Sequence, residues 1–449
     1  QTAQIHTALD PVLGLRVLLA QAIHAVHVEP DLARSALELA ATRAQNVTDE
    51  RWLGQLAYTH GWVWMHQPGR LSDAAVAFEQ AKALYESAGF TAGIALTLQR
   101  LAVTHHWQGN SQRGATLLEE AVTLHESIGD VLNLAPALGN LGSCERALGL
   151  NSATRRLQRA LSLAQDNRDI ALVGTIHTNL ANAYHGRWRI DAARYHYEQA
   201  IEHLRRAGRH RQSSIAIFNL GNLCADQGDG MAARSHLHRA RIQLNNTGEV
   251  GVESRVLLHL AKAHLDAGDT DKAQTLSVEA GEAIKQHGKG SNAHGTLRQL
   301  QGSIALDTGD TAAARKEWSA LPKAKEEPVL LAQLAWIDHQ EGQLEAARIG
   351  YEHCLNLLRG HAFERMVGRV YLRIACLHAQ QGNEEAAAEA MSEAHSQFEA
   401  TQDLVGMRNL EVLERCGMPR ATDVACAAPS MRPGGLEQRL LLRTFRSHE

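Results

Sequence analysis

The chain has 449 residues, of which 44% are hydrophobic and 21% are charged, and its net charge is −4 at pH 7. This composition excludes a chain that stays disordered because it is highly charged and poor in apolar residues. The slight negative charge gives no general attraction to nucleic acid or to an anionic membrane, and no apolar run approaches the ~18 residues of a membrane span. The six cysteines form no C-x-x-C pair, which indicates reduced thiols in a cytoplasmic protein and no zinc site.

Residues 1–51 predict an atypical helical hairpin at the start of the chain. Helical periodicity covers residues 11–26 and 30–45, and Pro30-Asp31 is a favourable start for the second helix. The chain opens on Gln1 within helical sequence, so we expect a fragment of a longer protein whose adjoining domains are missing.

A repeat follows between residues 52 and 402. Two small residues, seven positions apart, recur nine times, mostly at intervals of 39 or 40 residues and once at 34. Seven residues are two turns of helix, so both members of a pair face the same way and predict close contact with another helix. The pairs are Ala74 and Ala81, Gly114 and Ala121, Ala153 and Ala160, Ala193 and Ala200, Ala233 and Ala240, Ala273 and Ala280, Ala313 and Ala320, Ala347 and Cys354, and Ala387 and Ala394.

A turn signal precedes each pair by four or five residues. It is usually a glycine, which supplies the left-handed conformation that ends a helix: Gly69, Gly109, Gly149, Gly228, Gly268, Gly309, Gly342 and Gly382. Asp or Asn often follows, suited to capping the next helix: Asn110, Asp229, Asp269, Asp310 and Asn383. Around Trp188 the glycine is displaced to Gly186, so we expect an atypical turn there. The unit is helix, tight turn, helix.

Seven residues before the turn glycine, a leucine usually precedes a small residue, as in Leu101-Ala102. With this feature the unit resembles the tetratricopeptide repeat (TPR), best seen from Asn219-Leu220-Gly221-Asn222 to Ala240. The resemblance implies an all-α, right-handed superhelical solenoid of antiparallel helix pairs, with nine repeats over residues 52–402. Repeats this long resemble the sensor arms of signal-transduction ATPases related to the maltose-regulon activator, bacterial peptide-sensing regulators, and kinesin-light-chain and LGN-type arrays.

The C-terminal third contains the irregular features. Residues 316–328 include Pro322, and the next repeat arrives six residues early, so we expect a kink or a shortened helix, either as a hinge or as a local deletion. Residues 403–416 predict a capping helix. Residues 417–449 read as a linker and tail, in which Leu436 to Arg446 is the start of another domain, a partner-docking helix or a disordered tail.

No sequence motif indicates catalysis. The chain has no H-E-x-x-H, G-x-S-x-G or P-loop, and its 25 histidines show no metal-ligand spacing. His105, His264 and His378 recur at one packing position. We therefore expect no enzyme activity, no cofactor and no metal site.

The TPR resemblance implies that the first helix of each repeat lines a concave groove. The residue after the small position would point into it: Val103, Ser143, Asn182, Asn222, Lys262, Ser303, Trp336 and Cys376. Asn182 and Asn222 either grip a peptide backbone or are structural, and Arg146, His185 and Lys262 would favour acidic ligands. Asn140, Asn179 and Asn219 either join the site or stitch neighbouring repeats together.

Residues 150–255 carry 15 arginines against 9 acidic residues, but no aromatic residues interleave with them, so direct nucleic-acid binding is disfavoured. The function indicated is a non-catalytic TPR binding module that holds a protein, peptide or small effector in its groove. It would be the regulatory arm of a larger bacterial signalling or transcription-regulatory protein. The alternative is a free-standing adaptor that grips an extended peptide.

Overall fold

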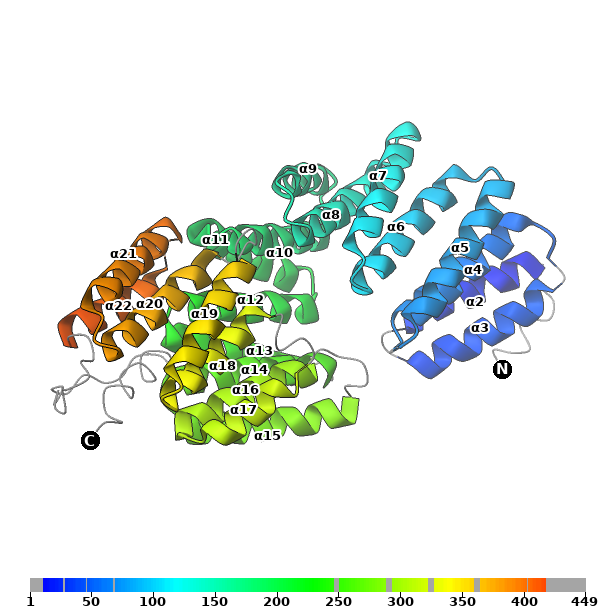
Figure 1. The fold of residues 1–449 in the computed structure, drawn as a ribbon. Coiled ribbons are helices and arrows are strands. Elements are labelled where there is room, and N and C mark those ends of the chain that lie inside the picture. The colour runs from blue at the N-terminus through cyan, green and yellow to red at the C-terminus, as the bar shows by residue number, and fades with distance from the viewer. Residues whose placement is uncertain are drawn as a thin grey trace. The chain divides into compact units, whose positions relative to one another are not determined.

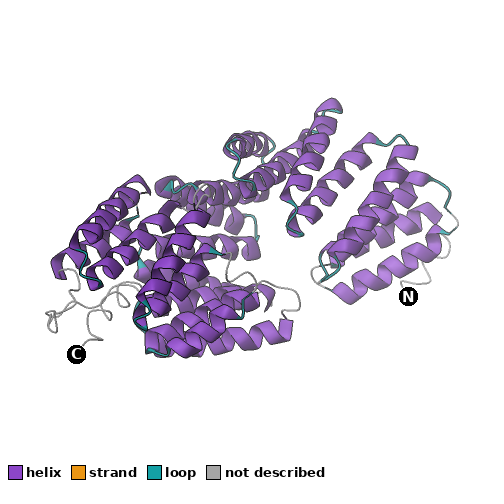
Figure 2. Ribbon diagram, in the orientation of Figure 1, coloured by secondary structure: helices purple, strands orange, loops and turns teal. Residues whose placement is uncertain are grey.

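A computed structural model of the chain describes residues 11–26, 29–45, 47–67, 69–245, 250–287, 293–321, 327–358, 364–401 and 403–416. These residues form helices and contain no strand (Figures 1 and 2). The all-helical prediction is therefore confirmed for the described part of the chain. The predicted linker and tail at 417–449, and Pro322, lie outside it.

The helices follow one another as antiparallel hairpins. Their bounds are α2 Pro11–Ala25, α3 Pro30–Ala44, α4 Glu50–Met65, α5 Leu71–Ser87, α6 Thr91–Trp107, α7 Ser111–Ser127, α8 Val131–Ala147, α9 Ser152–Asp166, α10 Ile170–Gly186, α11 Ile190–Arg206, α12 His210–Asp226, α13 Gly230–Asn245, α14 Val250–Asp266, α15 Thr270–His287, α16 Ala293–Thr308, α17 Thr311–Ser319, α18 Pro328–Gln340, α19 Leu344–Leu358, α20 Glu364–Gln380, α21 Glu384–Thr401 and α22 Leu404–Cys416. None of these helices is long and apolar enough to cross a membrane.

The chain divides into two compact units. Unit 1 comprises residues 1–184 and 202–208, and unit 2 comprises residues 185–201 and 209–449. Within each unit the even-numbered helix of a hairpin packs on the odd-numbered helix that follows, as in α4 with α5 and α14 with α15. First helices of neighbouring hairpins also contact each other, as α6 and α8 do in unit 1 and α14 and α16 do in unit 2. This is the helix-pair packing expected of a TPR-like fold.

Tight turns end the first helix of most hairpins. All eight predicted turn glycines have positive φ, from 73° at Gly149 to 88° at Gly109 and Gly309. The five predicted caps are also confirmed: in each, the side-chain oxygen of the Asp or Asn accepts from a backbone N–H three residues on. The turn chemistry read from the sequence therefore sets where these five second helices start.

The turn at Trp188 has the usual conformation with an unusual residue. Trp188 has φ 57°, and its N–H donates to His185 O at 2.9 Å, much as Gly149 donates to Arg146 O at 3.0 Å. The turn is thus atypical in sequence and ordinary in backbone geometry. Arg168, between α9 and α10, is a second non-glycine residue at positive φ, with φ 54°. Both positions carry the steric cost that a Cβ atom meets in this region.

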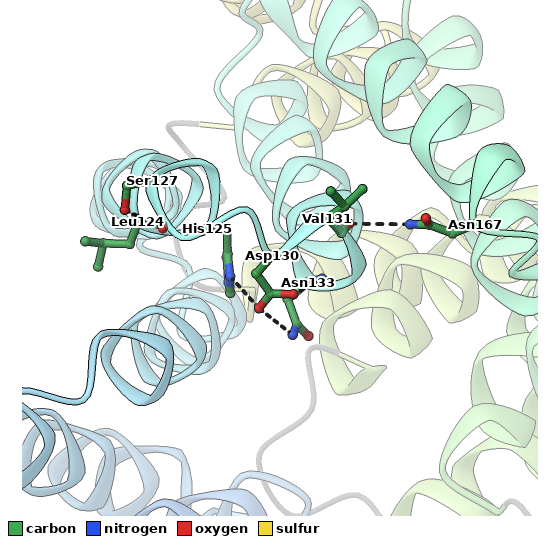
Figure 3. Close-up of polar contacts among 7 residues, drawn as sticks. All are labelled: Leu124, His125, Ser127, Asp130, Val131, Asn133 and Asn167. Atoms are coloured by element: carbon green, nitrogen blue, oxygen red, sulfur yellow. Dashed lines mark hydrogen bonds and ion pairs between the residues drawn. The ribbon is translucent and has the colours of Figure 1, made fainter.

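A polar latch holds one turn between hairpins of unit 1 (Figure 3). Asp130 lies before α8, and its carboxylate accepts from the backbone N–H and the side-chain amide of Asn133. The same carboxylate lies 3.1 Å from Nδ1 of His125, a fully buried residue at the end of α7. Burial raises the pKa of Asp130, but the hydrogen bonds from Asn133 and the nearby His125 outweigh it, so the pKa is lowered overall. Asn167 adds a bond to Val131 O at 3.4 Å.

The small residues mediate close packing between helices. Ala81, Ala121, Ala160, Ala200, Ala240, Ala280 and Ala394 are fully buried. A Cβ atom built on Gly142 of α8 would lie 2.6 Å from Cγ of Leu157 of α9, and one on Gly221 of α12 would lie 3.0 Å from Cγ of Leu237 of α13. A large side chain of the second helix therefore fits against a glycine of the first.

The predicted register is wrong by one residue in α17. Ala320 is exposed and Ala313 is only partly buried, whereas Ala314 and Leu321 are buried instead. The reason lies in the turn: the interval from Gly268 to Gly309 is 41 residues, one more than the interval from Gly228 to Gly268. In the two preceding repeats the buried small residues, Ala233 and Ala273, come five positions after the turn glycine. The same spacing from Gly309 makes Ala314 the buried small residue. Helix α17 has nine residues and ends in the segment where a shortened helix is expected.

Candidate binding groove

Unit 2 contains a cavity of about 560 Å³. Most of its lining comes from the first helices of successive hairpins, α12, α14, α16, α18 and α20, and α17 adds one side chain, Trp318. The lining residues are Asp226, Leu258, His259, Lys262, Leu265, Asp266, Thr296, Gln299, Leu300, Ser303, Trp318, Val329, Leu330, Ala332, Gln333, Met366, Arg369, Val370 and Arg373.

Helical spacing explains why these residues share one surface. On α14 the lining residues Leu258, Lys262 and Leu265 are separated by four and three positions, and so lie on one helix face. On α16 Gln299 and Ser303 are four apart, and the Ser303 hydroxyl donates to Gln299 O at 3.0 Å. The sequence therefore presents one face of α14 and one face of α16 to the cavity, and the lining residues Leu258, Leu265 and Leu300 also belong to the core of unit 2.

Trp318 is a buried part of the lining. It is 1% exposed, and its indole Nε1 donates to Gln299 O at 3.1 Å. Its ring lies directly over Gly302 of α16, where any Cβ atom would overlap with the indole. Gly302 and Trp318 thus fix the distance between α16 and α17 next to the cavity.

The carboxylates that line the cavity come from α12 and α14. Asp226 Oδ2 lies 2.9 Å from Nε2 of His185, and Asp266 Oδ2 accepts from Lys262 Nζ at 3.1 Å. The charge of Asp266 is the main cause that raises the pKa of Lys262, and Asp226 contributes in the same direction. The Lys262 side chain is 66% exposed, so the ammonium group is open to solvent as well as surrounded by charged neighbours.

Two guanidinium groups line the cavity from α20. Arg369 donates through Nε and Nη2 to Oδ2 of Asp403, at 3.2 and 3.1 Å, and Asp403 is fully buried. Arg373 is 7% exposed, donates from Nη1 to Ala332 O at 2.9 Å, and lies 5.2 Å from the centre of the Trp336 ring. These contacts hold both guanidinium groups in fixed positions.

Two further polar groups belong to the cavity. Burial lowers the pKa of His259 to about 4, helped by the nearby Lys262 and Arg255, so His259 is neutral near pH 7. Its ring packs edge-on against Phe218 with centroids 4.9 Å apart. The side-chain oxygen of Gln333 is buried and has no hydrogen-bond partner. It is therefore an acceptor whose burial is uncompensated in this structure.

Three of the described cysteine thiols are unsuited to nucleophilic chemistry. Burial raises the pKa of Cys144 and Cys354 to about 11 and that of Cys376 to about 12. These thiols are protonated near pH 7, and the thiolate is the nucleophilic form. Among the residues that the structure describes, no three His, Cys, Asp or Glu side chains are grouped to hold a metal ion.

The eight residues predicted for the groove are divided between the two units. Unit 1 holds Asn140 and Arg146 on α8, and Asn179 and Asn182 on α10; Arg146 is exposed and the three asparagines are partly buried. Unit 2 holds His185, Asn219, Asn222 and Lys262. Of the eight, Lys262 lines the cavity, and His185 contacts it through Asp226.

Two other expected groove residues are in the core instead. Trp336 and Cys376 are each 1% exposed and belong to one apolar cluster with Trp318 and Tyr351. The lining residues of α18 are Val329, Leu330, Ala332 and Gln333. Trp336 lies on the same face of α18 as Val329, Ala332 and Gln333, one turn further along the helix, where Arg373 lies over its ring.

Sequence reasoning missed Arg369, Arg373 and Gln333. Arg369 and Arg373 are four residues apart, on one helix face, in an otherwise apolar segment of α20. That spacing was visible in the sequence. Their location in the cavity was not, because it depends on how the hairpins after α17 continue.

No protein-family model matches the sequence, and no curated protein matches it in sequence. Solved structures match the fold. A Rap protein complexed with competence and sporulation factor aligns with a TM-score of 0.57 at 13% identity, over 78% of this chain and 98% of that one. NprR in complex with its cognate peptide NprX aligns with a TM-score of 0.53 at 13% identity, over 77% and 98%. Aspartyl phosphate phosphatase F from Bacillus subtilis aligns with a TM-score of 0.52 at 11% identity, over 77% and 94%. At these identities the likeness shows that the chain has a TPR-like helical-repeat fold.

Proposed function

We propose that the chain is a non-catalytic TPR-type binding module whose cavity in unit 2 holds a peptide. It would serve as the effector-binding arm of a larger bacterial signalling or transcription-regulatory protein. The observation that carries the proposal is the cavity itself, about 560 Å³ in volume and lined by first helices of successive hairpins. Ligand pockets typically measure ~300–1,000 Å³ and combine apolar walls with a few polar groups, as this one does.

The solved structures support a peptide as the occupant. NprR was solved with its cognate peptide, and a Rap protein was solved with competence and sporulation factor. The sequence resemblance to sensor arms of signal-transduction ATPases supports the regulatory role. The alternative is an adaptor that grips an extended segment of a partner protein, for which Asn182 and Asn222 would hold the peptide backbone.

Filling the cavity tests the proposal. The probe is a mixture of synthetic random hexapeptides passed over immobilised protein, with the retained peptides measured by mass spectrometry. Ser303 lines the cavity from α16, so Ser303→Trp fills part of it. Ser392 is exposed on α21, a second helix, so Ser392→Trp is the matched control.

We expect the natural chain and Ser392→Trp to retain a defined subset of peptides, and Ser303→Trp to retain at least about tenfold less of it. Circular dichroism and the thermal midpoint establish that both variants are folded. Equal retention by folded Ser303→Trp would show that peptides bind elsewhere or non-specifically, and the proposal would fail.

A further inference from the structure

The row of helices that lines the cavity closes on itself through α22. Gly228 lies in the turn between α12 and α13, and its φ is 77°. A Cβ atom built on Gly228 would lie 3.0 Å from Cγ2 of Val405 and 3.4 Å from Nη1 of Arg408, both on α22. The last helix of unit 2 therefore contacts the turn that follows the first lining helix. We call this contact the seam.

The seam is thin compared with the joins between the other helices of the row. One cluster of buried apolar residues runs from Ile217 of α12 to Ile304 of α16, and another runs from Leu306 of α16 to Leu413 of α22. Within the described part of the chain, neither cluster contains residues of α22 together with residues of α12 or α13. Because hydrophobic stabilisation scales with the apolar area that is buried, separating the seam costs less than separating neighbouring hairpins.

A hinge position lies in the middle of the same row of helices. The two clusters meet within α16, where Leu300 and Ile304 belong to the first and Leu306 belongs to the second. Helix α16 is the middle one of the five first helices that line the cavity, whereas the seam lies between the two ends of this row. Hairpins that share a packed core move together as a block. A rotation about α16 would therefore open the cavity at the seam.

We propose that the seam is the gate of the cavity: α18–α22 rotate as one block about α16, and the seam opens to admit and release the occupant. This inference rests on the proposed function for the occupant and specifies how the occupant enters. The gate is closed in this structure, because α22 contacts Gly228.

Helix α22 is fixed to the block that would move. The Asp403 side chain caps α22 by accepting from Gly406 N at 3.1 Å, and it also accepts from Nε and Nη2 of Arg369 on α20, at 3.2 and 3.1 Å. A Cβ atom on Gly406 would overlap with the Phe398 ring of α21, so α22 and α21 are in close contact. Arg369 lines the cavity, and a movement of α22 therefore carries part of the cavity wall with it.

The turn on the other side of the seam is fixed to its own block. Gln227 accepts from Nη2 of Arg194 on α11 at 2.6 Å, and Asp229 caps α13 by accepting from Ala232 N at 3.0 Å. Each side of the seam is thus held by contacts within its own block. Opening of the cavity is therefore confined to the seam, where the buried apolar area is smallest.

Thiol labelling inside the cavity tests the gate without a ligand. Ser303→Cys places a thiol in the cavity lining, and Ser392→Cys places one on the exposed surface of α21 as the reference. Both variants also carry Cys416→Ser and Cys426→Ser, and the four other cysteines of the chain are buried. Labelling with a bulky maleimide is followed by mass spectrometry of the fragments that contain residues 303 and 392.

A disulfide across the seam should slow labelling inside the cavity. In a disulfide the Cβ atom of one cysteine lies about 3 Å from the sulfur of the other, and a Cβ atom at residue 228 would lie 3.0 Å from Cγ2 of Val405. With Gly228→Cys and Val405→Cys oxidised, we expect Ser303→Cys to be labelled at least about tenfold more slowly, because the open state is removed. Ser392→Cys in the same background should be labelled at its usual rate. Equal labelling of Ser303→Cys with and without the disulfide would overturn the inference.

A smaller side chain at the seam should have the opposite effect, and this test does not require the disulfide to form. Val405→Ala removes the methyl group that contacts Gly228, so Ser303→Cys should be labelled about threefold faster. Val278→Ala, at an exposed position of α15, is the matched control and should leave the rate unchanged. Thermal midpoints establish that the variants are folded. An unchanged rate in folded Val405→Ala would show that the seam does not limit access, and the inference would fail.

The labelling experiment and the peptide-retention experiment fail independently. Slower labelling with the disulfide, together with equal peptide retention by Ser303→Trp, would support the gate and overturn the proposed function. Unchanged labelling, together with loss of peptides in Ser303→Trp, would overturn the gate and leave the proposed function standing.

Discussion

Helices α6–α9 of unit 1 and α16–α19 of unit 2 are both pairs of successive hairpins, yet they differ in length and in packing. The first four have 17, 17, 17 and 15 residues, and the second four have 16, 9, 13 and 15. In both regions a glycine of the first helix packs against a large side chain of the second helix. That side chain comes four residues after a buried alanine of the second helix. In α8 and α9 these are Gly142 and Leu157, and in α16 and α17 they are Gly302 and Trp318.

The comparison shows that the same contact, a glycine against a large side chain, occurs in the core of unit 1 and beside the cavity of unit 2. Leu157 is fully buried in the core of unit 1. Trp318 occupies the corresponding position, but it is long enough to reach the cavity lining and to bond Gln299 O as well. The short α17 therefore packs on α16 through its largest side chain.

The largest expected effect is the loss of Trp318. Trp318→Ala should lower the free energy of unfolding by about 3–5 kcal/mol, because it opens a void beside Gly302 and leaves Gln299 O without its indole donor. Urea unfolding of the variant, with hydrogen exchange in α16–α18, measures it. Leu157→Ala is the control in the regular region, with an expected cost of about 2–5 kcal/mol. A loss below about 1 kcal/mol for Trp318→Ala would show that α17 does not depend on this side chain.

Next in size is the pH dependence from His339 of α18. Burial lowers its pKa to about 4, and the residue is 2% exposed. The unfolded chain, with a histidine pKa of about 6.5, therefore binds the proton more readily than the folded chain. Stability from neutral His339 is fully present above pH 6.5 and is lost as the pH falls toward 4, by about 3 kcal/mol. In His339→Gln the free energy of unfolding should depend less on pH between these values, which urea unfolding at several pH values measures.

His125, in the polar latch of unit 1, should contribute less to the pH dependence of stability than His339. Burial also lowers the pKa of His125, but the charge and hydrogen bond of Asp130 act in the opposite direction. His125→Gln should therefore flatten the same pH profile less than His339→Gln does. An equal or larger effect at His125 would mean that Asp130 does not offset burial there.

A double-mutant cycle tests the fit between Gly302 and Trp318. Gly302→Ala should cost about 1–3 kcal/mol, because its methyl group would overlap with the indole. In the Trp318→Ala background this cost should vanish, since nothing rigid remains above residue 302. Gly139→Ala on α8 is the control, because its Cβ atom would meet only Ile176, at 3.7 Å, and alanine favours the helix. Additive effects of the two changes would rule out the direct contact as the cause.

The smallest effect concerns the turn before α10. Arg168 is exposed with φ 54°, so Arg168→Gly should raise the free energy of unfolding by about 1 kcal/mol through relief of backbone strain. Trp188→Gly relieves similar strain but removes the ring contact with His185, so it should gain less. Thermal midpoints of the two variants measure the difference. A lower midpoint for Arg168→Gly would mean that the side chain stabilises this turn by more than the strain costs.

Much of the fold follows from local sequence signals. Turn glycines such as Gly109 and caps such as Asn110 act within a few residues, so the chain around them is enough to predict them. The register of α17 depends on a one-residue insertion before Gly309, which the spacing of small residues concealed. The division into a hairpin at 1–51, nine repeats at 52–402 and a capping helix at 403–416 remains a prediction.

The site was harder to predict than the fold. The location of Lys262 in the cavity could be predicted, because Lys262 comes directly after Leu260-Ala261 in a regular repeat. Arg373 depends on the path of the chain after α17, because the cavity on α18 and α20 stops about one turn before Trp336 and Cys376, the residues that earlier repeats suggest. Such long-range consequences of a shortened helix are not encoded in the repeat pattern, and only three-dimensional packing reveals them.

The contact between Gly302 and Trp318 also limits how this array can be rearranged. Repeats are often treated as interchangeable parts, but here α9 and α17 each carry a side chain matched in size to the glycine of the preceding first helix. If α17 were exchanged with α9, the Leu157 side chain would be too small to fill the space above Gly302, and Trp318 would be too large for the space above Gly142. Recombination at the boundaries between hairpins would preserve these matched pairs, whereas recombination within the turn of a hairpin would separate them.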